Sequence, residues 1–152
     1  MLALSVWEPF GLAMAQLGKD VENRDWRTHH RGEFLIHVTQ SVKRANYEMG
    51  VKTIRHISGA SVAALVPPYE KRRKGGIVGL ACLVDVISPC LGACSRPWHF
   101  HDSYGFLLEG MRPLPFVACS ATRRGGFWNV PPEVLRALHE ATGDKRFARE
   151  AA

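Results

Sequence analysis

LSVWEPFGLAMAQLGKDVENRDWRTHHRGEFLIH, residues 4–37, decides the fold that we expect for this chain. The apolar residues before Trp7 favour a short strand over residues 1–6. Three apolar residues then recur at helical spacing: Phe10, Met14 and Leu17. FLIHV, residues 34–38, favours a second strand. The stretch therefore predicts a strand, a helix and a strand, joined by a polar connector.

The connector between the predicted helix and the second strand carries clustered charges around one tryptophan. Strand-like alternation would place Glu22, Arg24 and Trp26 on one face. Lys19 follows Gly18 at the helix end, where the helix dipole favours a cation. Two cations, one carboxylate and an aromatic ring are the groups that hold a nucleobase and its phosphate. The alternative interpretation is a helix-capping lysine, a structural ion pair and a core tryptophan.

Further basic residues and histidines follow in the same connector. Arg27 and Arg31 add charge suited to a nucleic-acid backbone. His29 and His30 are expected to be exposed turn residues. His37 falls within the second strand and is more typical of a hydrogen-bonded core histidine than of a catalytic base.

The rest of the chain predicts several strands with two or three helices, which favours an α+β fold with a mixed or closed sheet. The expected strands cover residues 77–87, 104–109 and 116–120. The expected helices cover residues 40–49, closed by Gly50, and residues 131–142, which Pro131 and Pro132 open and Gly143 ends. The prolines of MRPLP, residues 111–115, argue against a continuous central strand. Residues 88–103 are expected to be a long loop, and residues 144–152 a polar tail that frays.

Composition limits the classes of partner. A chain of 152 residues suits one domain with one sizeable core. The formal net charge of +6 and the isoelectric point near 9.5 favour a polyanionic partner such as nucleic acid. The sequence holds no apolar run of membrane-spanning length, so we expect no membrane partner. The first residues lack a basic segment and predict structure instead of a secretion signal, so we expect four reduced cysteines and a cytoplasmic location.

Several motifs of this chain together resemble one known family. They are K-x-x-E-x-R from Lys19, WRT at 26–28, LIH at 35–37, PWHF at 97–100 and YGFLLEGMRPLPF at 104–116. On these motifs the chain resembles the ASCH (activating signal cointegrator homology) domains of the PUA-like superfamily. The resemblance implies a PUA-like β-barrel flanked by helices, formed as a single domain by residues 1–143. It also implies a cleft for RNA or another nucleic acid, with no cofactor and no metal. The implied ligand residues are Lys19, Glu22, Arg24, Trp26, Arg27 and Arg31.

The same resemblance leaves enzymatic alternatives open. Some ASCH proteins are amidohydrolases of a modified nucleoside, an acetylated cytidine, and others are linked to RNA cleavage as ribonucleases. In the deacetylating members a Lys-x-x-Thr-x-Arg pattern carries the reaction. Here Lys19 and Arg24 match that pattern, but Glu22 replaces the threonine. Lys19 and Glu22 would be the catalytic residues if the chain were an enzyme. A protein-interaction adaptor is the last alternative, without an apolar stripe in the sequence to favour it.

Two further clusters of the sequence contain metal-binding or basic side chains. Cys90, Cys94, His99 and His101 form C-x3-C-x4-H-x-H, a set of residues that can bind zinc. The spacing is more compact than that of the familiar zinc fingers, and His99 and His101 would point oppositely on a strand. A cysteine-containing loop is therefore the favoured interpretation. Residues 71–74, KRRK, form a basic run that predicts either a solvated loop or an extension of the phosphate-binding surface.

Overall fold

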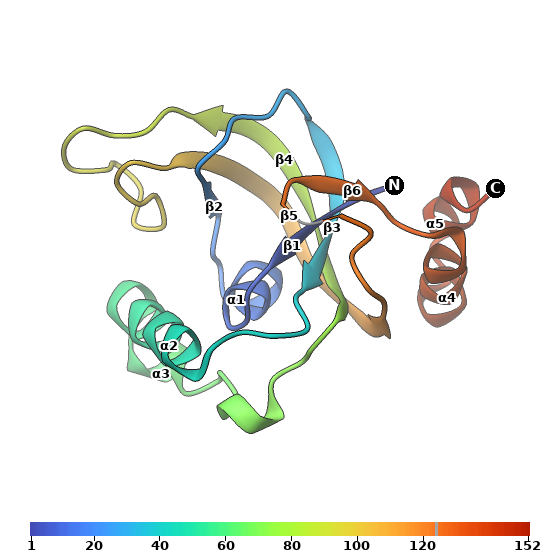
Figure 1. Ribbon diagram of the computed structural model, residues 1–152, viewed down its shortest axis with the longest axis horizontal. Helices are drawn as coiled ribbons and strands as arrows, with labels where there is room; N and C mark the ends of the chain where they lie inside the picture. Colours follow the sequence, from blue (N-terminus) through green and yellow to red (C-terminus); the bar gives the residue numbers. More distant parts are fainter. Residues whose placement is uncertain (124) are drawn as a thin grey trace.

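A computed structural model describes residues 1–123 and 125–152 of the protein (Figure 1). Its six-stranded mixed sheet curls into a half-barrel that helices flank, which confirms the predicted α+β class. The strands are β1 (Leu2–Val6), β2 (Val21–Arg24), β3 (Gly32–Val38), β4 (Gly76–Ile87), β5 (Tyr104–Ala118) and β6 (Phe127–Asn129). The helices are α1 (Phe10–Gln16), α2 (Arg44–Ser58), α3 (Ala60–Ala63), α4 (Pro132–Thr142) and α5 (Lys145–Glu150), with a short 3-10 turn η1 (Tyr69–Lys71).

The order of the strands in the sheet is β2-β5-β4-β3-β1-β6. β1 and β3 pair in parallel, with Ser5 beside His37, while the other strand pairs are antiparallel. A parallel pair needs a crossover connection, which α1 and β2 supply here. The crossover carries the charged connector to the far edge of the sheet, where β2 pairs with β5. The connector therefore lies at an edge of the half-barrel.

Apolar side chains fill both faces of the curled sheet. Inside the half-barrel, Trp26 meets Phe106 edge-on with ring centroids 5.1 Å apart. Phe127 of β6 packs edge-on against Trp26 and against Phe34 in the same cluster. On the outer face, α4 and α5 cover a second cluster at the right of Figure 1. The members of that cluster include Leu35, Leu80, Leu114, Trp128, Leu135, Leu138 and Phe147.

The expected interruption between the strands at residues 104–109 and 116–120 is wrong. β5 runs continuously through MRPLP, residues 111–115. Pro113 pairs with Gly79 of β4. β2 covers the other side of β5 only from Tyr104 to Leu107. Beyond that point β5 is an edge strand, where a residue without an N–H loses no ladder hydrogen bond. Register shifts in β4 near Gly79 accommodate the same region.

The predicted end of the second helix at Gly50 is also wrong. α2 continues to Ser58, and Gly59, with φ of 92°, ends it. Gly50 is buried inside the helix, where a Cβ atom would lie 2.7 Å from Cδ of Pro9. Gly50 thus allows α2 to pack closely against the start of α1. The local sequence does not distinguish such a packing glycine from one that ends a helix.

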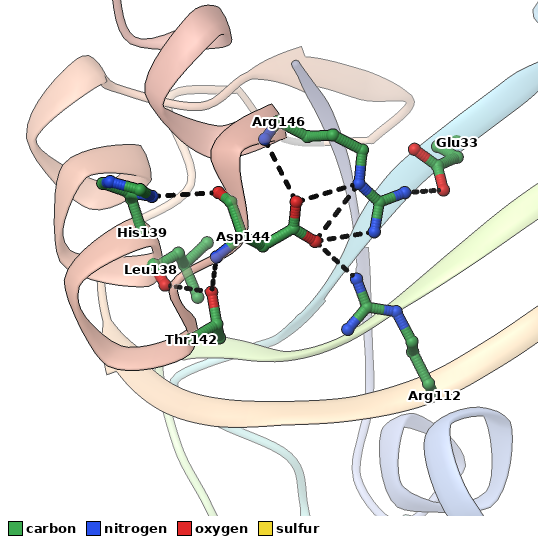
Figure 2. Close-up of polar contacts among 7 residues, drawn as sticks. All are labelled: Glu33, Arg112, Leu138, His139, Thr142, Asp144 and Arg146. Carbon is green, nitrogen blue, oxygen red and sulfur yellow. Dashed lines mark hydrogen bonds and ion pairs between the residues drawn. The ribbon is translucent and has the colours of Figure 1, made fainter.

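The expectation of a fraying polar tail after Gly143 is wrong, because residues 145–150 form α5. Phe147 has no exposed surface and packs in the outer cluster. Asp144 caps α5 by accepting from the Arg146 N–H at 3.0 Å. Figure 2 shows its carboxylate between Arg146 and Arg112 of β5, and Arg146 also pairs with Glu33 of β3. One apolar anchor and these ion pairs hold the segment against the sheet.

The expectation of four reduced cysteines is wrong in the loop between β4 and β5. Cys90 and Cys94 form a disulfide, whereas Cys82 and Cys119 are free. The loop prediction itself is confirmed, because residues 88–103 contain no helix or strand. Among the helices that the structure describes, none has both the length and the apolar character needed to cross a membrane.

Candidate functional site

The curled sheet leaves a cleft where β2 faces the end of β1. β6 pairs with β1 only as far as Leu4, so the following part of β1 lacks that neighbour. Arg24 of β2 reaches across and donates to the Ser5 carbonyl oxygen at 2.7 Å. A cavity of about 300 Å³ lies at this seam. Its lining residues are Ser5, Val6, Trp7, Phe10, Lys19, Glu22, Asn23, Arg24 and Phe100.

Lys19 lies at the bottom of this cleft with only 1% of its surface exposed. Its backbone N–H caps α1 by donating to the Ala13 carbonyl at 3.1 Å, and Gly18, with φ of 77°, makes the turn. Its ammonium donates to Glu22 Oε2 at 2.6 Å and to the Val21 carbonyl. The expected capping role therefore belongs to the Lys19 backbone, while the side chain turns inward to the cleft.

The surroundings of Lys19 change its acidity. Burial lowers the pKa of the Lys19 ammonium, and the negative charge of Glu22 opposes that shift. Phe10 and Trp98 flank the ammonium, with ring centroids 5.5 and 5.9 Å from Nζ. Aromatic faces at this range attract a cation, so they offset part of the lost hydration. The result is a desolvated lysine that is easier to deprotonate than one in water.

Glu22 and Arg24 form the walls of the cleft above Lys19. Glu22 Oε1 accepts from Arg24 Nη2 at 3.0 Å, which confirms that the two side chains pair on one face of β2. Burial alone would raise the pKa of the Glu22 carboxyl, but the charges of Lys19 and Arg24 outweigh it and hold that pKa below its usual value. Glu22 is therefore a carboxylate at neutral pH, held between two cations.

Arg24 retains unused hydrogen-bonding capacity. Its Nε is buried, and among the described residues no partner lies within hydrogen-bond distance. A buried donor without a partner costs about 1–3 kcal/mol. Such atoms are uncommon in folded proteins, and a ligand or bound water is one of their explanations.

Asn23 joins β2 to the loop that closes the other side of the cleft. Its side-chain amide donates to the Trp98 carbonyl and its amide oxygen accepts from the Phe100 N–H, both at 2.8 Å. Trp98 is buried, and Phe100 lines the cleft. This two-point contact fixes the PWHF segment against the charged motif, although the two are more than 70 residues apart in sequence.

A second cavity, of about 930 Å³, adjoins the first and shares Ser5, Trp7 and Arg24 with it. Trp7 is 51% exposed where the two cavities meet. Ser5 Oγ lies 3.0 Å from His37 Nδ1 and accepts from the Trp128 indole at 3.1 Å. His37 Nε2 lies 3.2 Å from the Cys119 carbonyl, which can only accept, so Nε2 carries the proton. His37 is thus the hydrogen-bonded core histidine that its strand position predicted, and burial lowers its pKa.

The remaining predicted ligand residues lie apart from the cleft. Trp26 follows the end of β2 and packs inside the half-barrel, at the edge of a third cavity that Phe127 also lines. Arg31 is exposed and pairs with Asp85 at 3.1 Å, and the exposed Arg27 adds its charge near the same aspartate. The structure therefore brings together Lys19, Glu22 and Arg24, and places the other three elsewhere on the half-barrel.

The basic run at residues 71–74 is partly occupied by internal contacts. The Arg72 guanidinium lies 3.8 Å from the ring centroid of Tyr69. Arg73 pairs with the buried Glu8 at 3.3 Å. Lys71 and Lys74 are exposed. At most part of this run is thus available to a phosphate backbone.

Sequence reasoning missed Ser5, Trp7, Phe10, Asn23 and Phe100 as parts of the site. Asn23 had one available signal, since it lies between Glu22 and Arg24. The others reach the cleft only through β1–β3 pairing and the return of the long loop. Such contacts leave no local pattern in the sequence.

A scan of the chain against protein-family models finds no match, and a search of the curated proteins finds no significant match. The chemical case for the cleft therefore rests on its own residues. They provide a carboxylate, two cations and aromatic rings around a cavity of about 300 Å³.

Proposed function

We propose that the cleft binds a base of single-stranded RNA, and that the chain is an RNA-binding module with a PUA-like fold of the ASCH type. The observation that carries the proposal is the triad Lys19, Glu22 and Arg24 lining a cavity of about 300 Å³ beside aromatic residues. A carboxylate accepts from base amino groups, and a guanidinium donates to base carbonyls or phosphates.

Trp7 supports the same proposal. The exposed indole stands between the two cavities, so a base could stack on it while its neighbour enters the cleft. Stacking of this kind contributes about 1–3 kcal/mol per base. The net charge of +6 supplies long-range attraction for a phosphate backbone.

Fluorescence anisotropy with a labelled single-stranded RNA, at two salt concentrations, tests the proposal. Trp7→Ala should weaken binding by about tenfold, the loss expected for one stacked base. Arg24→Gln should weaken it further, because it removes a cation and the fork of guanidinium donors from the cleft. Arg136→Gln on the outer helix α4 removes the same charge from an exposed site and is the matched control.

Binding that Arg24→Gln and Arg136→Gln reduce equally would reject the cleft as the RNA site. So would failure to bind RNA at low salt. Thermal melts of each variant separate lost binding from lost folding.

A second candidate function is amidohydrolysis of a modified nucleoside, and the buried Lys19–Glu22 pair favours it. Burial lowers the pKa of the Lys19 ammonium, and in its neutral form this lysine would accept a proton from the attacking water. The resulting hydroxide would attack the acetyl carbonyl, and the proton would pass, by way of Glu22, to the departing amine. The products are acetate and the free nucleoside. The ribonuclease alternative uses the same cleft without a specific observation in its favour.

Mass spectrometry of acetylated nucleosides incubated with the protein tests this candidate. Product that forms with the wild-type chain and is absent with Lys19→Met, at a temperature where a thermal melt shows the variant folded, would support it. Equal product from both proteins, or none from either, would remove the enzyme from consideration.

A further inference from the structure

The long loop between β4 and β5 brings three metal-binding side chains together. One ligand atom each from Cys90, Cys94 and His99 lies within 4.8 Å of the other two. The two cysteines are joined as a disulfide, with Cα atoms 5.7 Å apart. His101, the fourth member of the sequence motif, is exposed and lies outside this group.

The hydrogen bonding of His99 leaves one ring nitrogen ready to bind a metal. Its Nε2 lies 2.8 Å from the Ser103 carbonyl oxygen. A carbonyl oxygen can only accept, so Nε2 carries the proton and Nδ1 of the neutral ring keeps a free lone pair. Metal-binding histidines commonly donate their second N–H to such an oxygen, which fixes the tautomer and the ring orientation.

Packing also holds the His99 ring in place. His99 is only 6% exposed, and its Cδ2 would lie 2.9 Å from a Cβ atom added at Gly105. The glycine therefore makes room for the ring against the backbone of β5. A ligand that is buried and oriented before binding loses little conformational freedom when a metal arrives.

We propose that reduction of the Cys90–Cys94 disulfide creates a zinc site made of the two thiolates and His99 Nδ1. Two electrons and two protons from a thiol reductant, itself oxidised to a disulfide, convert the S–S bond to two thiols. Zinc then displaces both thiol protons as it binds. The disulfide form and the zinc-bound form are alternatives, because the sulfurs cannot form the S–S bond and act as thiolate ligands at once.

The geometry suits zinc after a small adjustment. In a tetrahedral site with Zn–S near 2.3 Å and Zn–N near 2.0 Å, ligand atoms stand about 3.5–3.8 Å apart. One ligand atom from each of the three residues already lies within 4.8 Å of the other two. On reduction the two sulfurs separate to the tetrahedral spacing, a movement within the loop that leaves the sheet in place. Two thiolates and one imidazole favour zinc over calcium or magnesium, which prefer oxygen ligands. A water molecule would fill the fourth position.

The site is connected to the cleft through the chain on either side of His99. Trp98 and Phe100 are the residues that Asn23 holds by hydrogen bonds. A metal on His99 would therefore stiffen the wall to which Phe100 belongs. This link is independent of what the cleft binds, so the zinc site can be tested without a nucleic acid.

Zinc analysis of the whole chain, purified without a histidine tag, tests the proposal. The protein is reduced with a phosphine, which does not compete for zinc as a thiol would, incubated with zinc and desalted. Elemental mass spectrometry should find about one zinc per chain, as expected for one site with three protein ligands and a water molecule. Protein whose disulfide is intact should retain none.

Matched variants assign the metal to this loop. Cys94→Ser should abolish retention, while the double variant Cys82→Ser and Cys119→Ser removes the other two thiols and should retain zinc. Cobalt added to the reduced protein should give thiolate-to-metal absorption that Cys94→Ser loses. Reduced protein without zinc, or zinc retained by Cys94→Ser or by the disulfide form, would overturn the proposal. None of these readouts depends on RNA binding.

Discussion

Arg24 of β2 donates a hydrogen bond of 2.7 Å to the backbone carbonyl of Ser5 in β1, although the two strands lie far apart in the sheet order. The curl of the sheet brings them together, and a side chain closes the seam where backbone pairing is missing. The same guanidinium nitrogen contacts Glu22 at 3.0 Å. The group that shapes the cleft is therefore also one of its charged walls.

Arg24→Lys should destabilise the fold while retaining the charge. A lysine ammonium is a single point donor and cannot reproduce the placement of the guanidinium against both Ser5 and Glu22. Loss of one charged hydrogen bond corresponds to about 1–2 kcal/mol in the free energy of unfolding. Urea denaturation measures the change. A variant as stable as wild type would show that the seam does not depend on this contact.

Lys19→Met should be strongly destabilising because it leaves the Glu22 carboxylate buried beside only one cation. Removing one member of a buried ion pair costs about 3 kcal/mol or more. The double variant Lys19→Met, Glu22→Gln should recover part of that loss, since no unpaired carboxylate remains. A double-mutant cycle from urea denaturation gives the coupling between the two residues. Additive losses would contradict a direct pairing.

Asp144→Ala should loosen α5 and lower stability by about 1 kcal/mol, the usual loss for a helix cap. The carboxylate also pairs with Arg112 and Arg146 (Figure 2). Hydrogen exchange should report faster amide exchange in residues 145–150 than in β4. Uniform exchange across the two elements would show that α5 does not open separately.

Stability should also depend on pH through Asp144. Arg146 holds the pKa of its carboxyl well below the usual value of 3.8. The unfolded chain therefore binds this proton first as pH falls, so the stabilisation is complete above about pH 5 and declines below it. Urea denaturation at pH 6 and pH 3 should show a smaller difference in Asp144→Ala than in wild type. An equal difference would assign the acid sensitivity to other carboxylates.

His37 should contribute a separate loss at mildly acidic pH. Burial lowers its pKa from the ordinary value of 6.5, so the unfolded chain takes up this proton first. The stabilisation is complete above about pH 7 and falls as pH decreases through the ordinary pKa of histidine. His37→Gln should flatten the dependence between pH 7 and 5. An unchanged slope would indicate that another histidine is responsible.

Gly50→Ala should destabilise the protein, contrary to the usual effect in a helix. Alanine normally stabilises a helix interior by about 1 kcal/mol relative to glycine. Here its methyl group would lie 2.7 Å from Cδ of Pro9, and overpacking costs about 1–3 kcal/mol. Thermal melts measure the sign, with Lys52→Ala on the exposed surface of α2 as control. A higher melting temperature for Gly50→Ala would show that Pro9 yields to the added methyl group.

The sequence by itself determined five of the helices and strands and the charged core of the site. Helical spacing of apolar residues predicted α1 and α4, and short apolar runs predicted β1, β3 and β4. The spacing of Glu22 and Arg24 predicted their pairing, because alternate residues of one strand share a face.

Only the tertiary structure decided which distant segments cover those elements. Pro113 lies within a continuous strand because that part of β5 is at the edge of the sheet. Phe147 holds the last helix in place because it packs into the apolar cluster on the outer face of the sheet. Phe100 reaches the cleft, and His99 the paired cysteines, through a loop without periodicity. The apolar pattern of a segment predicts which of its side chains are buried. Which distant segment packs against them depends on the strand order and the curl of the sheet.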